Sequence, residues 1–169
     1  MPAPGTTIEG SPVSSGLASL DEILRGGYAA SRIHLIEGAP GSGKTTLGLQ
    51  FLLEGRRKGE RCLYITLSES RDELHHVAGT HGWSLDGIEV FELVPPELSL
   101  DPAREQSIVY ASDLELGETV QMVMDEVERV APARIVFDSL SEIRLLSQTS
   151  LRYRRQALAL KHFFARRDC

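Results

Sequence analysis

A glycine-rich octapeptide constrains this chain more than any other feature. In the pattern G-x-x-x-x-G-K-T, glycines let backbone N–H groups face inward around a di- or triphosphate. The lysine reaches the β- and γ-phosphates, and the threonine hydroxyl can bind Mg²⁺. We therefore predict a phosphate-binding loop, with a chance glycine-rich turn as the alternative. The residues of the pattern are Gly38, Ala39, Pro40, Gly41, Ser42, Gly43, Lys44 and Thr45.

The segments on either side of the loop fit a strand that enters it and a helix that leaves it. Residues 32–36 are short and mainly apolar, which predicts a buried strand. Residues 45–53 have a helical pattern, and the N-terminus of that helix would add its dipole to an anion site. We expect a bound nucleotide to contact the octapeptide and Thr46.

Strands alternate with helices along the rest of the chain, which predicts an α/β fold with a mainly parallel sheet. Capping-box patterns predict helix starts at residues 19–22 and 70–73. A long connection is expected over residues 94–117. The other expected elements are strands over residues 62–67, 88–93 (at a sheet edge) and 134–138, and helices over residues 118–130 and about 150–167.

Length and composition favour one cytoplasmic domain. The chain has 169 residues and a net charge of −6 at pH 7, which argues against a general nucleic-acid binder. No apolar run approaches the roughly 18 residues of a membrane span. Cys62 and Cys169 do not suggest a disulfide framework. We expect a flexible tail over residues 1–13 and a domain over residues 14–169.

Two acidic residues at the ends of predicted strands are candidates for chemistry. Asp138 ends the strand over residues 134–138, where a carboxylate can hold Mg²⁺ directly or through water. Glu69 follows the strand over residues 62–67, and the carboxyl ends of parallel strands face the ligand crevice. It could orient water against a γ-phosphate. The alternatives are that Asp138 caps a turn and that Glu69 is an exposed turn residue.

Three segments carry a resemblance to a known family. Residues 15–27 resemble the G-L-D-x-x-L-x-G-G signature that precedes the P-loop of KaiC-like ATPases, in the RecA/RadA branch of P-loop NTPases. Residues 65–70 resemble the segment with their catalytic glutamates, and residues 137–141 resemble their Walker B region. The resemblance covers residues 14–169 and implies a three-layer RecA-like fold.

The resemblance also implies roles for individual residues. Lys44 and Thr45 would bind phosphate and Mg²⁺, Asp138 would support the metal, and Glu69 would polarise the attacking water. Where the clock ATPase usually has two adjacent glutamates, this chain has Ser68 and Glu69, so one carboxylate is absent. Ser19 replaces the usual glycine of the upstream signature.

The resemblance places further elements beyond Cys169. These are a strand between the P-loop strand and the Walker B strand, and basic residues that reach a neighbouring subunit's γ-phosphate. We therefore expect a sheet that is incomplete at the C-terminus. Full-length relatives often carry two such domains in hexameric rings, so self-association is expected as well.

The leading functional hypothesis is ATP binding with Mg²⁺-dependent ATP hydrolysis. Three alternatives remain open: a serine/threonine autokinase, a RadA/RecA-type DNA-dependent ATPase, and a nucleotide-binding module without turnover. His75 and His76 are adjacent, so a shared helix face for metal binding is not expected. The basic residues of the last predicted helix are interpreted as a solvated face rather than a nucleic-acid site.

Overall fold

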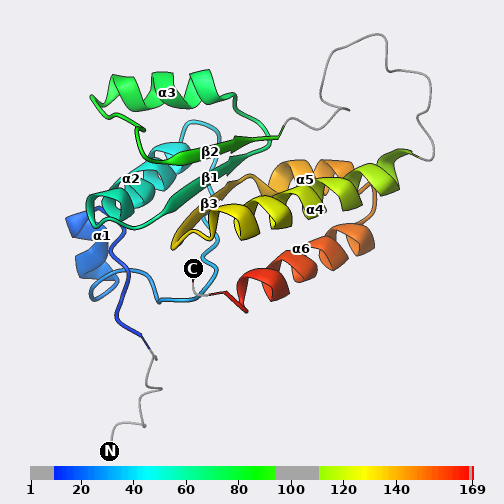
Figure 1. Ribbon diagram of the computed structural model, residues 1–169, viewed down its shortest axis with the longest axis horizontal. Helices are drawn as coiled ribbons and strands as arrows, with labels where there is room; N and C mark the ends of the chain where they lie inside the picture. Colours follow the sequence, from blue (N-terminus) through cyan, green and yellow to red (C-terminus); the bar gives the residue numbers. More distant parts are fainter. Residues whose placement is uncertain (1–9, 94–110, 168) are drawn as a thin grey trace, which may run out of the picture.

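Three parallel strands form the centre of the protein, in the order β2-β1-β3 (Figure 1). The computed structural model describes residues 10–93, 111–167 and 169. In the central strand β1, Thr66 is level with Glu92 of one neighbour and Asp138 of the other. The three strands predicted downstream of the loop are thus confirmed. They are β1 (Cys62–Thr66), β2 (Glu89–Glu92) and β3 (Arg134–Asp138).

Helices cover both faces of the sheet, which gives the expected three-layer α/β arrangement (Figure 1). On one face lie α2 (Lys44–Arg57) and α3 (Arg71–Thr80). On the other lie α4 (Ala111–Val130), α5 (Leu140–Leu146) and α6 (Ser150–Phe164). The short helix α1 (Ala18–Ile23) precedes them in the chain.

Alternate residues of β1 enter two different hydrophobic layers. Leu63 and Ile65 pack with apolar residues of α4, α5 and α6. Cys62 and Tyr64 pack with α2 and α3. All five residues of β1 are buried, as expected for a parallel strand that is covered on both faces.

One of the two predicted capping boxes is confirmed and the other is wrong. At α3, the Ser70 hydroxyl accepts from the backbone N–H of Glu73, and the Glu73 carboxylate accepts from the backbone N–H of Ser70. At α1, the cap is Leu17, without a side-chain hydrogen bond. The helix begins at Ala18, so Ser19 lies inside it, and Asp21 accepts hydrogen bonds from Ser14 and Ser15. These bonds lower the pKa of Asp21 although burial alone would raise it.

The predicted strand over residues 32–36 is wrong. The segment leads into the phosphate loop without regular secondary structure. The physical reason is that a strand needs a neighbour to receive its backbone hydrogen bonds. In the described part of the chain, β3 pairs only with β1, and no strand pairs with residues 32–36. The side chains of Ile33 and Leu35 are consequently 55% and 65% exposed.

Two helical elements differ from the sequence prediction. Helix α4 begins at Ala111, seven positions before the predicted start, because the apolar spacing of Val120, Val123 and Val127 continues back to the buried Leu116. The remainder of the predicted long connection, residues 94–110, lies outside the described residues. Helix α5 was not predicted, and Ser139 caps it by accepting from the backbone N–H of Ser141. None of the described helices is long and apolar enough to cross a membrane.

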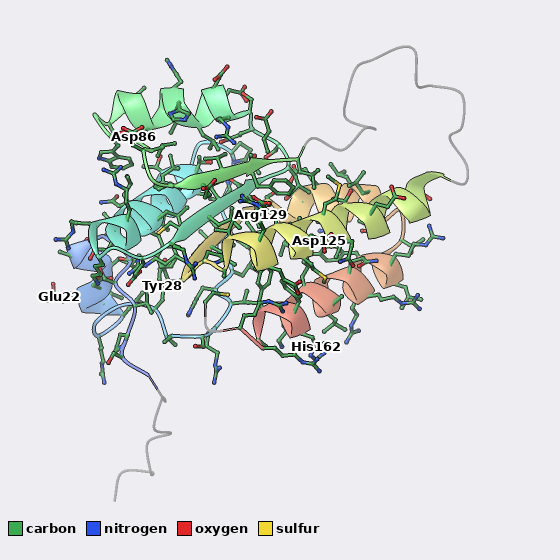
Figure 2. All side chains as sticks on the ribbon, in the orientation of Figure 1. Glu22, Tyr28, Asp86, Asp125, Arg129 and His162 are labelled. Atoms are coloured by element: carbon green, nitrogen blue, oxygen red, sulfur yellow. The ribbon has the colours of Figure 1, made fainter. Side chains whose placement is uncertain are left out.

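The segment upstream of the loop is attached to α2 and β3. Val13 and Tyr28, both in this segment, exchange backbone hydrogen bonds, and the ring of Tyr28, which Figure 2 labels, packs against His34 and against Phe51 of α2. The buried side chain of Arg134 donates to the carbonyl oxygens of Ser14 and Phe51 and pairs with Glu60. Arg134 therefore connects the segment upstream of the loop to α2 and β3.

Candidate nucleotide site

The glycine-rich octapeptide forms an exposed loop that ends in the first turn of α2. Gly41 and Gly43 have φ angles of 77° and 86°, in the region that side-chain-bearing residues rarely adopt. A β-carbon on Gly38 would clash with the Ser42 hydroxyl in its present orientation. Two positions of the pattern, Gly41 and Gly43, thus favour glycine for their backbone conformation, and Gly38 leaves room for the Ser42 side chain. The other loop residues, Ala39 and Pro40, are exposed, and Thr46 is partly buried in α2.

The Lys44 ammonium lies over the loop itself. Its Nζ donates to the carbonyl oxygens of Gly38 and Ala39, at 3.0 Å each. These two bonds account for two of the three donors of a lysine ammonium. Because Lys44 is the first residue of α2, its positive charge and the helix N-terminus lie on the same side of the loop.

Thr45 connects the loop to both predicted acids. Its Oγ1 lies 3.3 Å from Oε1 of Glu69 and 3.4 Å from Oδ2 of Asp138. A hydroxyl has one proton, so Thr45 can donate to only one of these carboxylates at a time. Both distances are also longer than the usual 2.7–2.8 Å (roughly) of an O–H···O bond. The Thr45 hydroxyl can therefore make only a long, weak hydrogen bond to one carboxylate or the other.

The parallel sheet explains why these residues meet. Asp138 ends β3 level with Thr66 of β1, and its carbonyl oxygen accepts from the backbone N–H of Leu67 at 2.8 Å. Glu69 follows three residues after Thr66. Since the carboxyl ends of parallel strands lie at one edge of a sheet, both acids reach the loop that precedes α2.

A hydroxyl that the sequence analysis missed holds the turn that carries Glu69. Oγ1 of Thr66 accepts from the backbone N–H of Glu69 at 2.9 Å and donates to the Glu69 carbonyl oxygen at 2.7 Å. Thr66 is fully buried. The backbone of the turn is thus fixed to the end of β1.

The electrostatic environment of Glu69 is unfavourable for its charge. Burial first, and the neighbouring Asp138 carboxylate second, raise the pKa of Glu69 above its ordinary value. Its Oε2 is buried and has no hydrogen-bond partner among the described residues. A buried acceptor without a partner is costly, so this oxygen is suited to a donor or a cation that enters the site.

Tyr64 is the second residue that the sequence analysis missed. Its hydroxyl donates to Oδ2 of Asp138 at 2.7 Å. Burial, together with the Asp138 charge, raises the pKa of Tyr64 well above its ordinary value. The available signal was the alternation along β1, where Tyr64 and Thr66 interrupt an apolar run at positions that share one face.

The oxygen atoms of this site suit magnesium. A hydroxyl and two carboxylates are hard ligands, and Mg²⁺ in nucleotide sites is usually bound by one or two carboxylates together with phosphate oxygens. Among residues 10–93, 111–167 and 169, no group of three or more His, Cys, Asp or Glu residues could hold a metal ion. His75 and His76 are exposed on α3.

A loop that wraps at the start of a helix and two acids at the ends of adjacent parallel strands define a RecA-like P-loop NTPase domain. The profile of the family described as “ATPase: KaiC” matches residues 13–169. The chain therefore belongs to the KaiC family of ATPases, which is a family of nucleotide-binding proteins.

Individual relatives agree with this assignment. The chain is 35% identical to the circadian clock oscillator protein KaiC of Picosynechococcus sp. over 131 residues, which is 78% of this chain and 23% of the relative. It is 27% identical over 136 residues to the UPF0273 protein PH0284 of Pyrococcus horikoshii, with 78% of this chain and 55% of that protein covered. The chain thus spans about a quarter of the length of the clock protein.

Proposed function

We propose that this domain binds ATP with Mg²⁺ and hydrolyses it to ADP and phosphate. The observation that carries the proposal is the position of Thr45, whose hydroxyl lies between Glu69 and Asp138 at 3.3 and 3.4 Å. One hydroxyl next to the phosphate loop thereby meets a candidate metal-holding acid and a candidate water-orienting acid.

The phosphate-binding role belongs to the loop and Lys44. Backbone N–H groups of the loop and the α2 N-terminus would hold the phosphate oxygens, and the Lys44 ammonium would balance their charge. Thr45 and Asp138 would hold Mg²⁺. When bound, this ion neutralises charge that develops on the transferring phosphoryl group.

Glu69 is the candidate water-orienting residue. Its Oε2 is buried without a described partner, and its raised pKa makes the carboxylate a better proton acceptor than an ordinary glutamate. The neighbouring Ser68 is exposed and has no carboxylate. A single acid would therefore orient the water, and slow hydrolysis is expected.

Nucleotide binding and phosphate release by the 169-residue chain test the proposal. Lys44→Ala is expected to lose most affinity for Mg-ATP. Glu69→Gln is expected to bind Mg-ATP and to release phosphate at least about 100-fold more slowly. Glu73→Gln, a change at an exposed glutamate of the α3 cap, is the matched control. The proposal would be abandoned if Lys44→Ala bound Mg-ATP as tightly as the parent.

The same assay separates the other hypotheses. Label from γ-labelled ATP that stays on the protein would indicate an autokinase. Phosphate release that depends on single-stranded DNA would indicate a DNA-dependent ATPase. Binding without phosphate release would indicate a nucleotide-binding module. Self-association and a cytoplasmic location stay predictions, and sedimentation with and without Mg-ATP checks the first.

A further inference from the structure

Tyr64 places a phenol hydroxyl in the hydrophobic layer beneath the nucleotide site. The side chain is fully buried on the central strand β1. A buried tyrosine hydroxyl needs a hydrogen-bond partner, because an unpaired one is costly. The partner is Oδ2 of Asp138, on the adjacent strand, at 2.7 Å. The bond therefore joins the hydrophobic core to the carboxylate that we assign to the metal.

The surrounding packing fixes the position of the Tyr64 ring. The ring belongs to the same buried cluster as Leu49 and Leu52 of α2 and Leu74 of α3. A β-carbon on Gly48 would lie 3.9 Å from Cε2 of the tyrosine, so α2 passes directly over the ring. This packing holds the phenol oxygen of Tyr64 beside Asp138.

Two hydroxyls approach the same oxygen of Asp138, and they are not equivalent. The Tyr64 bond is 2.7 Å long, a usual length for a hydroxyl that donates to a carboxylate. The Thr45 oxygen is 3.4 Å away and has Glu69 as a second acceptor. The orientation of the Asp138 carboxylate is therefore determined by Tyr64, and Thr45 stays available to other ligands of the site.

We propose that Tyr64 is a positioning residue that presents the Asp138 carboxylate to Mg²⁺. The inference rests on the proposed function and adds a residue from outside the phosphate loop and the two acids. A hydrogen-bond partner behind a metal-holding carboxylate fixes its orientation, and its loss typically lowers metal affinity about 10- to 100-fold. Tyr64 acts on the metal through Asp138 and does not touch the nucleotide.

The test measures Mg²⁺ dependence of nucleotide binding rather than turnover. Binding of a fluorescent ADP derivative to the 169-residue chain is titrated without Mg²⁺ and at increasing Mg²⁺ concentrations. Tyr64→Phe keeps the ring and removes the hydroxyl. We expect it to raise the Mg²⁺ concentration for half-maximal enhancement about tenfold or more, with unchanged ADP affinity in the absence of Mg²⁺.

Two further variants make the result specific. Tyr153→Phe, a change at a partly buried tyrosine that packs on the opposite face of the sheet, should behave as the parent. In an Asp138→Asn background, Tyr64→Phe should add nothing, because the carboxylate it positions is gone. Circular dichroism and thermal unfolding establish that each variant is folded.

The outcomes are distinguishable. An unchanged or lowered Mg²⁺ requirement in Tyr64→Phe overturns the inference. So does an unfolded Tyr64→Phe variant, or an equal loss of ADP affinity with and without Mg²⁺, because the hydroxyl would then support the fold rather than the metal. If the parent itself shows no Mg²⁺-dependent binding, the proposed function fails.

Discussion

Gly48 of the P-loop helix lies so close to Val136 of β3 that a β-carbon on the glycine would be 3.0 Å from Cγ1 of the valine. This contact lies one helical turn from Lys44 and Thr45, and Val136 is two residues before Asp138. The absence of a side chain at position 48 therefore sets the distance between the loop and the acid at the end of β3.

Gly48→Val should push α2 away from the sheet. Overpacking of this kind costs about 1–3 kcal/mol of the free energy of unfolding. Because Thr45 moves with the helix, Mg-ATP affinity should fall as well. Gly79→Val is the matched control, since a β-carbon there meets nothing within 4 Å, and it should change stability by less than about 0.5 kcal/mol. Equal effects of the two changes in chemical denaturation would contradict the argument.

Thr66→Val should disturb the turn that carries Glu69. The change removes a buried hydroxyl that makes two hydrogen bonds to the Glu69 backbone, at a cost of about 1–3 kcal/mol. Phosphate release should slow while the affinity for ATP is retained, because the loop is not touched. Thr66→Ser keeps the hydroxyl and should restore most of the turnover. If serine and valine behave alike in both measurements, the turn does not depend on this hydroxyl.

Glu69 should make the folded protein less stable as the pH rises. Its pKa in the folded state is raised above the ordinary value of 4.5, so the folded state binds a proton where the unfolded chain has released it. The penalty is absent below the unfolded-state pKa and complete above the folded-state pKa. Glu69→Gln should therefore be more stable than the parent at neutral pH, with a difference that shrinks towards about pH 4.

Glu73 provides a control, because its pKa is shifted in the opposite direction to that of Glu69. Hydrogen bonds from the Ser70 backbone and hydroxyl lower its pKa, so its contribution is present at neutral pH and is lost as the pH falls through its folded-state pKa. Urea titrations of Glu69→Gln, Glu73→Gln and the parent, between about pH 4 and neutral pH, give the free energy of unfolding of each protein. If Glu69→Gln were less stable than the parent at neutral pH, the charge of the Glu69 carboxylate would not destabilise the folded state.

Arg134→Met should be destabilising. The arginine side chain is 1% exposed, and its loss leaves the Ser14 carbonyl oxygen without this donor and Glu60, which is 34% exposed, without its ion-pair partner. The loss of these hydrogen bonds should cost about 1–3 kcal/mol of the free energy of unfolding. The matched control is Arg129→Met, since Arg129, labelled in Figure 2, lies in the last turn of α4, is 61% exposed and pairs with Glu126 and Glu89. That change should have little effect on the denaturation midpoint.

Local signals in the sequence predicted the elements whose determinants are local. The strand at residues 134–138 and the capping box of Ser70 and Glu73 are confirmed because a short apolar run or two side chains suffice to define them. The backbone of the glycine-rich loop also has a local determinant, since Gly41 and Gly43 adopt the positive φ angles that glycine allows. Phosphate binding by the loop stays a prediction.

Elements that depend on distant partners were predicted less well. Residues 32–36 have the apolar character of a strand, but strand formation also needs a paired neighbour, which no described residue provides. At α1, the pattern suggested that Ser19 caps the helix, but the helix begins at Ala18, so Ser19 lies inside its first turn. Tyr64 meets Asp138 across 74 positions, and only the pairing of β1 with β3 shows that they touch.

The alternation of β1 has a consequence for how insertions and deletions act on this domain. Tyr64 and Thr66 face the nucleotide site from the same strand whose other face contributes Leu63 and Ile65 to the helical layer of α4. A one-residue slip of a strand exchanges its two faces. A single residue inserted between α2 and β1 leaves the register unchanged where the connection absorbs it, but it would turn both hydroxyls towards the α4 layer and two aliphatic chains towards Asp138 where the strand slips by one residue. Changes in the length of this connection should consequently be tolerated only when β1 keeps its pairing register with β2 and β3.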